Sequence, residues 1–343
     1  MSNVSEEDKI LLSHGSGGKL MHRLIEDLFK KKFQNEILDR LSDSAVIPEI
    51  LQETGELCFT TDSYVVDPLF FPGGNIGKLA VCGTVNDLAV EGAVPLFLTC
   101  GMILEEGLEI SLLERITESM AQAAREAGVK IVAGDLKVVE KNKADKVFIN
   151  TSGIGIKKKN VPLGKEHIAP GDKILINGPI GDHGVAVLAA RGDFELEMDV
   201  KSDCAALNGL IQDILKGSDK VKLMRDPTRG GLATTLNEIV SGAGFGIELQ
   251  ENALPLKEET RAACEILGFD PLFLANEGKV VIVCGASDAD KILDIMKRHA
   301  LGKESRVIGE VAAAPAGKVV MTTLMGGHRI IDMLVGEQLP RIC

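Results

Sequence analysis

The 343-residue sequence has no tryptophan, a single tyrosine and no long apolar run, and each absence limits what the protein can be. With eleven phenylalanines as the main aromatic residues, the core must be built mostly from aliphatic side chains. No run of about 18 apolar residues occurs, so the sequence predicts no membrane-spanning helix. The sequence also has no basic block and a formal net charge of −12, which makes nucleic acids and anionic membranes poor candidates for partners.

Cysteines are few, odd in number and widely spaced. The seven are Cys58, Cys82, Cys100, Cys204, Cys264, Cys284 and Cys343. None forms a CxxC pair with another, so we expect neither a disulfide framework nor a structural zinc site. This usage, together with an acidic, polar start that does not resemble a signal peptide, predicts a cytoplasmic protein.

The order of the expected elements predicts two α/β domains, because the chain is long for one core. In the first half we expect helices from about residue 76 and over 112–127, and strands at 57–61, 95–104, 129–137 and 147–156. In the second half we expect strands at 172–177, 280–283 and near 307 and 319, and helices over 232–240 and 287–299.

Domain boundaries follow from the turn-rich passage 157–170, which we interpret as a linker. The expected parts are a Gly-rich loop and helix over 1–40, a first domain over 41–157, a second domain over 168–325 and a mobile tail over 326–343. Residues 192–221 carry no clear pattern.

A Gly-rich loop, Gly15-Ser-Gly-Gly-Lys19, leads into a helix-like run. Such a loop offers free backbone N–H groups to an anion. It is not a P-loop, because Ser13 stands where that pattern needs glycine and Leu20 where it needs serine or threonine. A loop that covers phosphates and a flexible entry turn both remain open.

Aspartates recur at the ends of strand-like runs and inside an apolar helix. An isolated buried carboxylate is costly, so it normally has a cation or a hydrogen-bond donor beside it. For any one of them a cap or surface role is the more common explanation, but several together favour a magnesium–phosphate site. The group consists of Asp43, Asp62, Asp87, Asp135 and Asp226.

Two further stretches carry chemistry. Asp226-Pro-Thr-Arg-Gly-Gly231 predicts a tight turn that directs charge and a hydroxyl toward one point before a helix. The chain ends in Pro340-Arg-Ile-Cys343, where Gly336 offers a joint and a terminal thiol can visit more than one site. On position alone, a frayed tail that happens to end in cysteine remains the alternative.

Together these stretches resemble the aminoimidazole-ribonucleotide-synthetase (PurM-like) superfamily of ATP-using enzymes, over nearly the whole chain from about Ile10. The Pro-Arg-Ile-Cys ending is similar to that of the hydrogenase-maturation carbamoyl dehydratases within it. The resemblance implies two PurM-like α/β domains, a homodimer formed through the first-domain sheet, and binding of ATP and Mg²⁺.

The same resemblance implies a reaction and its partners. A carbamoyltransferase, HypF, would load a carboxamide onto the terminal thiol, and ATP-dependent dehydration would convert it to a thiocyanate. The HypC–HypD iron-scaffold complex would then accept the cyano group for a nickel–iron hydrogenase centre.

The resemblance also implies roles for single residues. Cys343 would carry the substrate, Lys137 would supply positive charge and Glu277 would act as the base, although an ordinary salt bridge is the alternative for the last two. The implied metal ligands are Asp43, Asp62, Asp87 and Asp226. The implied nucleotide-binding residues are Gly15, Ser16, Gly17, Gly18, Asp62, Asn86, Asp87, Asp135, Thr228, Arg229, Gly230 and Gly231.

Two rival classes stay open. A selenophosphate synthetase would carry a reactive cysteine or selenocysteine near the Gly-rich loop, where this chain has Ser16, and neither it nor a thiamine-monophosphate kinase needs a terminal cysteine. A non-catalytic carrier would need neither the aspartates nor the Asp226–Gly231 turn. Measuring ATP hydrolysis separates an enzyme from a carrier.

Overall fold

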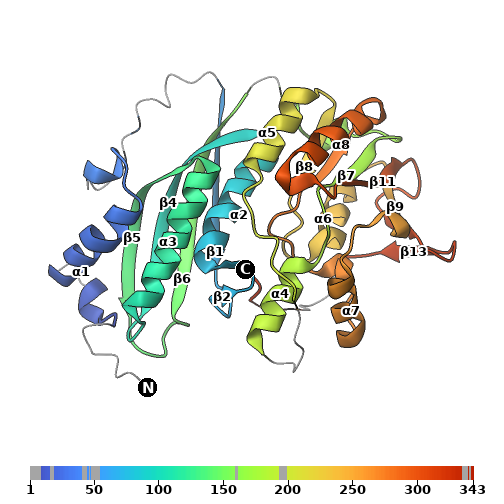
Figure 1. Ribbon diagram of the computed structural model, residues 1–343. Coiled ribbons are helices and arrows are strands. Elements are labelled where there is room, and N and C mark those ends of the chain that lie inside the picture. Colours follow the sequence, from blue (N-terminus) through green and yellow to red (C-terminus); the bar gives the residue numbers. More distant parts are fainter. Residues whose placement is uncertain are drawn as a thin grey trace.

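The computed structural model describes residues 9–15, 19–40, 45, 47, 55–158, 161–192, 199–333, 339 and 341–343. They form two α/β domains that lie side by side, each with one large sheet (Figure 1). The two-domain α/β fold expected from the sequence is therefore confirmed. No helix of the described residues is long and apolar enough to cross a membrane.

The first domain is a four-stranded sheet in the order β1-β6-β4-β5, so that β1 and β5 are its two edges. Its strands are β1 (Glu56–Tyr64), β4 (Ala93–Glu105), β5 (Lys130–Val139) and β6 (Val147–Lys157). Strands β4 and β5 run parallel, and the other pairs are antiparallel. The small hairpin of β2 (Phe70–Phe71) and β3 (Gly74–Asn75) stands beside this sheet.

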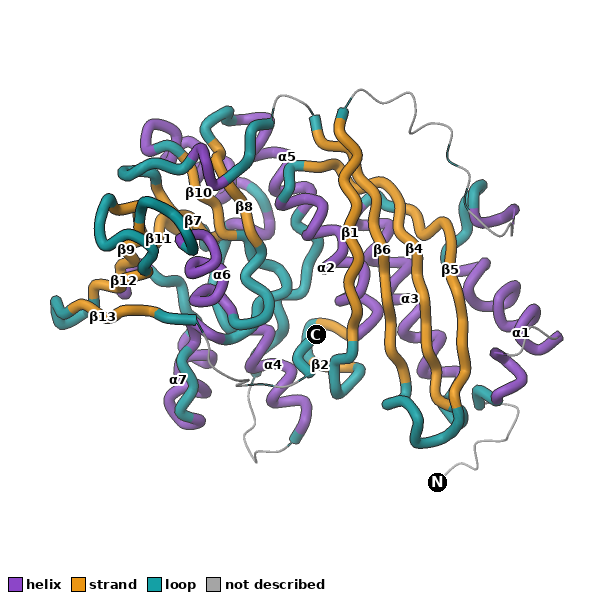
Figure 2. Tube along the Cα trace, turned by 180° about the vertical axis from the view of Figure 1, so that it is seen from behind, coloured by secondary structure: helices purple, strands orange, loops and turns teal. Residues whose placement is uncertain are grey.

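Helices cover one face of this sheet. They are α1 (Lys19–Leu24), the π-helical turn Ile25–Lys30 that continues it, α2 (Ile76–Val90) and α3 (Ile110–Ala127). Figure 2 shows the opposite face from behind, and none of the described helices lies over it. On that open face Leu57, Phe59, Val94 and Ile103 are 63%, 67%, 38% and 42% exposed.

Local sequence explains how the two long helices begin and end. The Asn75 side chain accepts hydrogen bonds from the N–H groups of Gly77 (2.9 Å) and Lys78 (3.1 Å), which caps α2. Helix α2 is buried on nearly all sides between sheet and second domain, which accounts for its continuous apolar sequence. Helix α3 ends at Gly128, whose φ of 71° suits glycine in the left-handed region.

The second domain has a seven-stranded sheet in the order β13-β12-β9-β11-β7-β10-β8. The strands are β7 (Lys173–Ile176), β8 (Val221–Arg225), β9 (Gly246–Gln250), β10 (Val281–Cys284), β11 (Arg306–Ala312), β12 (Val319–Thr322) and β13 (His328–Ile331). Its helices are α4 (Asp182–Arg191), α5 (Asn208–Gly217), α6 (Gly231–Val240), α7 (Glu258–Leu267) and α8 (Ala289–Arg298).

The tail begins later than residue 326. His328–Ile331 pairs with Val319–Thr322 along an antiparallel ladder and so belongs to the second-domain sheet. The Gly326-Gly327 pair is the turn of this hairpin and not the start of a tail. The chain leaves the sheet only after Ile331.

Candidate functional site

The last three residues are docked between the two domains, where the C label lies in Figure 1. The Val65 N–H donates to the Cys343 carbonyl (3.0 Å), and the Asp67 N–H donates to the Arg341 carbonyl (3.3 Å). The Ile342 side chain is 6% exposed and packs into the first-domain core. Residues 341–343 therefore occupy a specific docking site between the domains, which we call the seat of Cys343. A frayed end would make no such contacts.

The Cys343 thiol faces charged groups from both domains. Burial raises the pKa of this thiol to about 12, and the neighbouring Glu277 carboxyl raises it further while Arg229 lowers it. The Asp62 carboxyl, on β1, also raises the pKa of the thiol. The docked thiol is therefore protonated at neutral pH, and a thiolate would be strongly disfavoured in this seat.

Glu277 lies in the Asn276–Gly278 turn and is 3% exposed. Burial raises its pKa well above the ordinary range, and the nearby carboxylates of Asp203 and Asp226 add to the effect. The Asp203 carboxylate accepts the N–H groups of Glu277 (3.0 Å) and Gly278 (3.3 Å), which fixes the turn. A carboxyl with a raised pKa in a fixed position suits proton transfer near neutral pH.

Asp203, which holds the Glu277 turn, is a residue that sequence reasoning missed. It forms a buried ion pair with Lys279 (2.9 Å), and both side chains are less than a tenth exposed. It lies within residues 192–221, the part of the chain without a clear pattern. The signal that pointed to it is Lys279 itself, because a lysine at the start of a buried strand requires a carboxylate partner from elsewhere in the chain.

Three aspartates predicted as metal ligands, Asp62, Asp87 and Asp226, influence one another electrostatically. Burial raises the pKa of Asp87 to about 7, with Asp226 as the next cause, although a hydrogen bond from the Thr60 hydroxyl (2.9 Å) opposes this. Burial likewise raises the pKa of Asp226. A cation placed among these carboxyls would relieve their mutual repulsion.

The described side chains do not by themselves assemble the predicted metal site. Among the described residues, no three His, Cys, Asp or Glu side chains converge closely enough to hold a metal ion. Asp43 lies outside the described residues. The donor set fits Mg²⁺, which commonly takes one or two carboxylates and completes its shell with water and phosphate oxygens.

The Thr228–Gly231 stretch forms the start of α6. Gly230 and Gly231 have φ values of 74° and 61°, and a Cβ on Gly231 would lie 2.5 Å from the Leu274 carbonyl oxygen. Glycine is therefore required here to let the helix begin against the neighbouring turn. The exposed Arg229 side chain and the N-terminus of α6 together form an electropositive end beside Asp226, which suits a phosphate group.

A second group of predicted residues lies at the other edge of the first-domain sheet. On β5, Lys137 forms an ion pair with Asp135 (2.7 Å), and both side chains are more than half exposed. Gly15 packs against this strand, since a Cβ there would lie 2.6 Å from the Val138 nitrogen. Ser16, Gly17 and Gly18 are outside the described residues.

The sheet order separates this group from Cys343. Strands β6 and β4 lie between β1 and β5, so β5 is three strand spacings, roughly 14 Å, from the edge where Cys343 docks. Within one chain, the structure does not bring Lys137 or Asp135 to the thiol.

Asn86 is placed differently from the expectation that it binds nucleotide. Its side chain is 2% exposed. Its amide nitrogen donates to the carbonyls of Ala205 (3.0 Å) and Glu277 (3.4 Å), and its oxygen accepts the Leu207 N–H (2.8 Å). These bonds tie α2 to the second domain behind Glu277, which leaves Asn86 a role in holding the site together.

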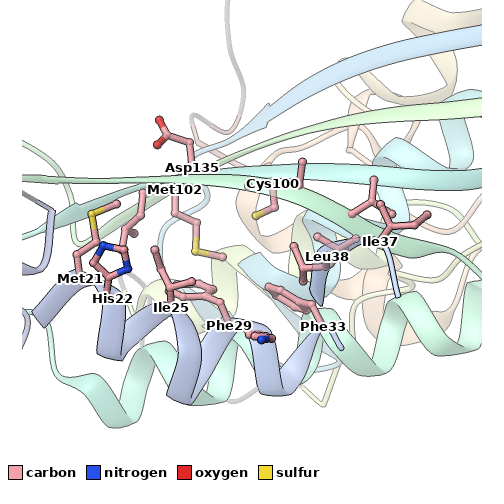
Figure 3. A pocket seen from close by; sticks show the side chains of 16 residues that line it. Met21, His22, Ile25, Phe29, Phe33, Ile37, Leu38, Cys100, Met102 and Asp135 are labelled. Carbon is pink, nitrogen blue, oxygen red and sulfur yellow. The ribbon is translucent and has the colours of Figure 1, made fainter. Parts of the chain in front are cut away.

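A cavity of about 300 Å³ lies between α1 with its π-helical continuation and strands β4 and β5 (Figure 3). Met21, Ile25, Phe29 and Met102 are among its mainly apolar lining residues. Figure 3 shows Asp135 pointing to the opposite side of its strand from these side chains. The cavity is thus separate from the charged cluster around Cys343.

Five of the other six cysteines are buried, and Cys58 is partly buried. Burial raises the pKa values of Cys100 and Cys284 to about 12 and that of Cys264 to about 11. Buried, protonated thiols of this kind behave as small apolar groups.

Comparisons with known proteins agree with this architecture. The family described as AIR synthase related protein matches through its N-terminal domain at residues 41–157 and its C-terminal domain at residues 169–322. The carbamoyl dehydratase HypE of Rhizobium leguminosarum bv. viciae is 52% identical over 336 residues, covering 98% of this chain and 95% of that protein.

Two solved structures are also similar. A crystal structure of the hydrogenase maturation protein HypE in complex with ATP has a TM-score of 0.92 and 48% identity, covering 97% of this chain and 99% of that one. A crystal structure of a HypE–HypF complex has a TM-score of 0.79 and 49% identity, covering 91% and 99%.

Proposed function

Because the chain belongs to the HypE family of carbamoyl dehydratases, which act in hydrogenase maturation, we propose that it dehydrates an S-carboxamide on its own Cys343 to a thiocyanate, using ATP. The observation that carries this proposal is the seat of Cys343 beside Glu277 and Arg229. A thiol that merely ended the chain would need neither a docked backbone nor a buried carboxyl next to it.

The chemistry of dehydration matches the groups in this seat. An amide oxygen is a poor leaving group, and transfer of the ATP γ-phosphoryl group to it creates a good one. Loss of phosphate and of the two nitrogen-bound protons then gives the C≡N triple bond. Glu277 in its ionised form accepts one proton from nitrogen, the departing phosphate carries away the other, and Arg229 stabilises negative charge that develops on the departing oxygen.

The protonation state of the docked thiol implies that loading happens elsewhere. Carbamoyl transfer needs a thiolate, which the seat disfavours because burial raises the thiol pKa to about 12. The S-carboxamide is neutral, so it can enter the same seat without that cost. The tail therefore swings out to accept the carboxamide and returns with it, which also keeps the substrate at high effective concentration.

ATP binds where the α6 N-terminus and the carboxyls of Asp62, Asp87 and Asp226 lie together. The Thr228–Gly231 turn holds phosphate oxygens through backbone N–H groups and Arg229. Mg²⁺ among these carboxylates would neutralise charge on the transferring phosphoryl group. The ATP complex of the 48%-identical HypE supports nucleotide binding by this fold.

The chain acts as a homodimer whose sites are completed across the interface. The open face of the first-domain sheet exposes Leu57, Phe59, Val94 and Ile103, an apolar surface that a second copy can cover. Two sheets packed face to face around a twofold axis can place β5 of one chain beside β1 of the other. Lys137 and Asp135 then serve the Cys343 of the partner, which explains their separation within one chain.

The family resemblance implies the partners. HypF donates the carboxamide, which the solved HypE–HypF complex supports, and the HypC–HypD complex receives the cyano group for iron. The reaction takes place in the cytoplasm.

The experiment that tests the function compares Glu277→Gln with Glu259→Gln, a control on the exposed side of α7. Each protein is loaded with carboxamide by HypF, and conversion to thiocyanate is followed by mass spectrometry after ATP is added. Glu277→Gln should accept the carboxamide and convert it at least a hundredfold more slowly, since general-base catalysis contributes about 10²–10⁴. Conversion at the rate of Glu259→Gln would refute the assignment of the base.

A further inference from the structure

His183, which sequence reasoning passed over, touches the docked tail. It lies in the first turn of α4, its ring is fully buried, and its Nε2 atom is 2.8 Å from the carbonyl oxygen of Ile342. That carbonyl belongs to the peptide bond directly before Cys343. The histidine therefore acts on the last peptide unit of the chain, one residue from the reactive sulfur.

The hydrogen bonds around the ring determine which nitrogen carries the proton. A carbonyl oxygen only accepts, so the Nε2 atom must donate to Ile342. The Ser202 hydroxyl oxygen lies 2.8 Å from Nδ1 and already accepts the Cys204 N–H (3.1 Å), which leaves its own hydrogen for Nδ1. Burial lowers the pKa of His183, which favours this neutral form.

The ring is also held mechanically. Phe71 meets it edge to face, with ring centroids 5.4 Å apart and planes at 86°. The neighbouring Asp182 is fixed by an ion pair with Lys257 (2.6 Å) and by the Thr260 hydroxyl (2.7 Å), which anchors the first turn of α4. A donor so restrained can select one position of the tail.

We propose that His183 is a positioning residue, whose Nε2–H bond to Ile342 holds the tail in register so that the group on Cys343 lies against Glu277. Arg341 and Cys343 are otherwise held by the Val65 and Asp67 backbone and the Asp145 carboxylate of the first domain, and by the Arg191 side chain at the far end of α4. The carbonyl of Ile342 thus adds a second link to the second domain, directly before Cys343, and that domain also carries Glu277. This bond fixes the position of the Cys343 thiol relative to Glu277, because both are then attached to the second domain.

This inference rests on the proposed function for its effect on turnover, but docking itself can be measured without ATP or a carbamoyl donor. The full-length protein is treated with iodoacetamide, and alkylation of Cys343 is followed on the peptide that a glutamyl endopeptidase releases after Glu337. Because the docked thiol is protonated and shielded, its reaction rate reports the undocked fraction.

His183→Leu should raise the alkylation rate of Cys343 about tenfold, because loss of one buried hydrogen bond shifts the docking equilibrium by roughly that factor. His183→Gln, which can place an amide N–H near the Nε2 position, should restore a rate within about threefold of the wild type. Thr117→Val is the matched control, since it removes a buried hydrogen bond from α3, which makes no contact with His183, and it should leave the rate unchanged.

Ser202→Ala provides a second variant if His183→Leu does not fold, because it keeps the ring and removes its Nδ1 partner. It should raise the rate about threefold. Wild-type alkylation rates in His183→Leu and Ser202→Ala would overturn the inference, as would equal acceleration in Thr117→Val. A wild-type protein that shields Cys343 but never converts its carboxamide would refute the proposed function and leave the docking role standing.

Discussion

A mixed dimer can show whether Lys137 acts on the thiol of its own chain or on that of its partner. One chain carries Lys137→Ala and keeps Cys343, and the other carries Cys343→Ala and keeps Lys137. In each mixed dimer, one site combines the intact cysteine of the first chain with the intact lysine of the second. The roughly 14 Å between the β1 and β5 edges makes this the arrangement that the structure favours.

The expected magnitude follows from counting sites. When equal amounts of the two variants are unfolded together and refolded, about half of the dimers are mixed and each has one working site of two, so conversion should reach about one quarter of the wild-type rate per chain. Conversion of the Cys343 carboxamide is measured by mass spectrometry, with each variant refolded alone as the inactive control. If the mixture is as inactive as the separate variants, the shared site is refuted.

Two other predictions concern the sheet face and the acidic cluster. Phe59→Glu should give a 36.6 kDa monomer by sedimentation, because it places a charge in the proposed interface. Ile266→Glu, at a similarly exposed apolar position on α7 (66% exposed, against 67% for Phe59), should remain dimeric. A dimeric Phe59→Glu protein contradicts the proposed interface. Without nucleotide or Mg²⁺, Asp87→Asn should stabilise the fold, and more at pH 8 than at pH 5. Burial raises the folded pKa of Asp87 to about 7, against about 3.9 in an unfolded chain, so between these values the unfolded carboxyl ionises while the folded one stays protonated, and the wild type loses stability as the pH rises. Denaturant titrations at both pH values measure the difference, and an effect that does not grow with pH contradicts the assigned environment.

The elements predicted from local patterns are those that local forces determine. The apolar run from Ile76 and the glycine stop at Gly128 predicted α2 and the end of α3 closely. The strand-like runs of the first half appear as β1, β4, β5 and β6. Periodicity and capping depend on neighbours in the sequence, so they can be read without knowledge of the fold.

What the sequence did not reveal depends on contacts between distant segments. The order β1-β6-β4-β5 decides that Lys137 lies far from Cys343, and no local pattern encodes that order. Asp203, Asn86 and His183 act through partners about 75 to 190 residues away in the chain. Their side chains look ordinary in the sequence, and only the packing of distant segments gives them a role.

The central claim is that Cys343 carries the group that is dehydrated, and the mass of the C-terminal peptide tests it most directly. The wild-type protein is loaded by HypF and a carbamoyl donor, divided, and incubated with or without ATP and Mg²⁺. The peptide after Glu337 should carry a carboxamide on Cys343 without ATP, and should lose the mass of one water when ATP is present. A carboxamide that persists unchanged with ATP, or one found on a different cysteine, would contradict the account.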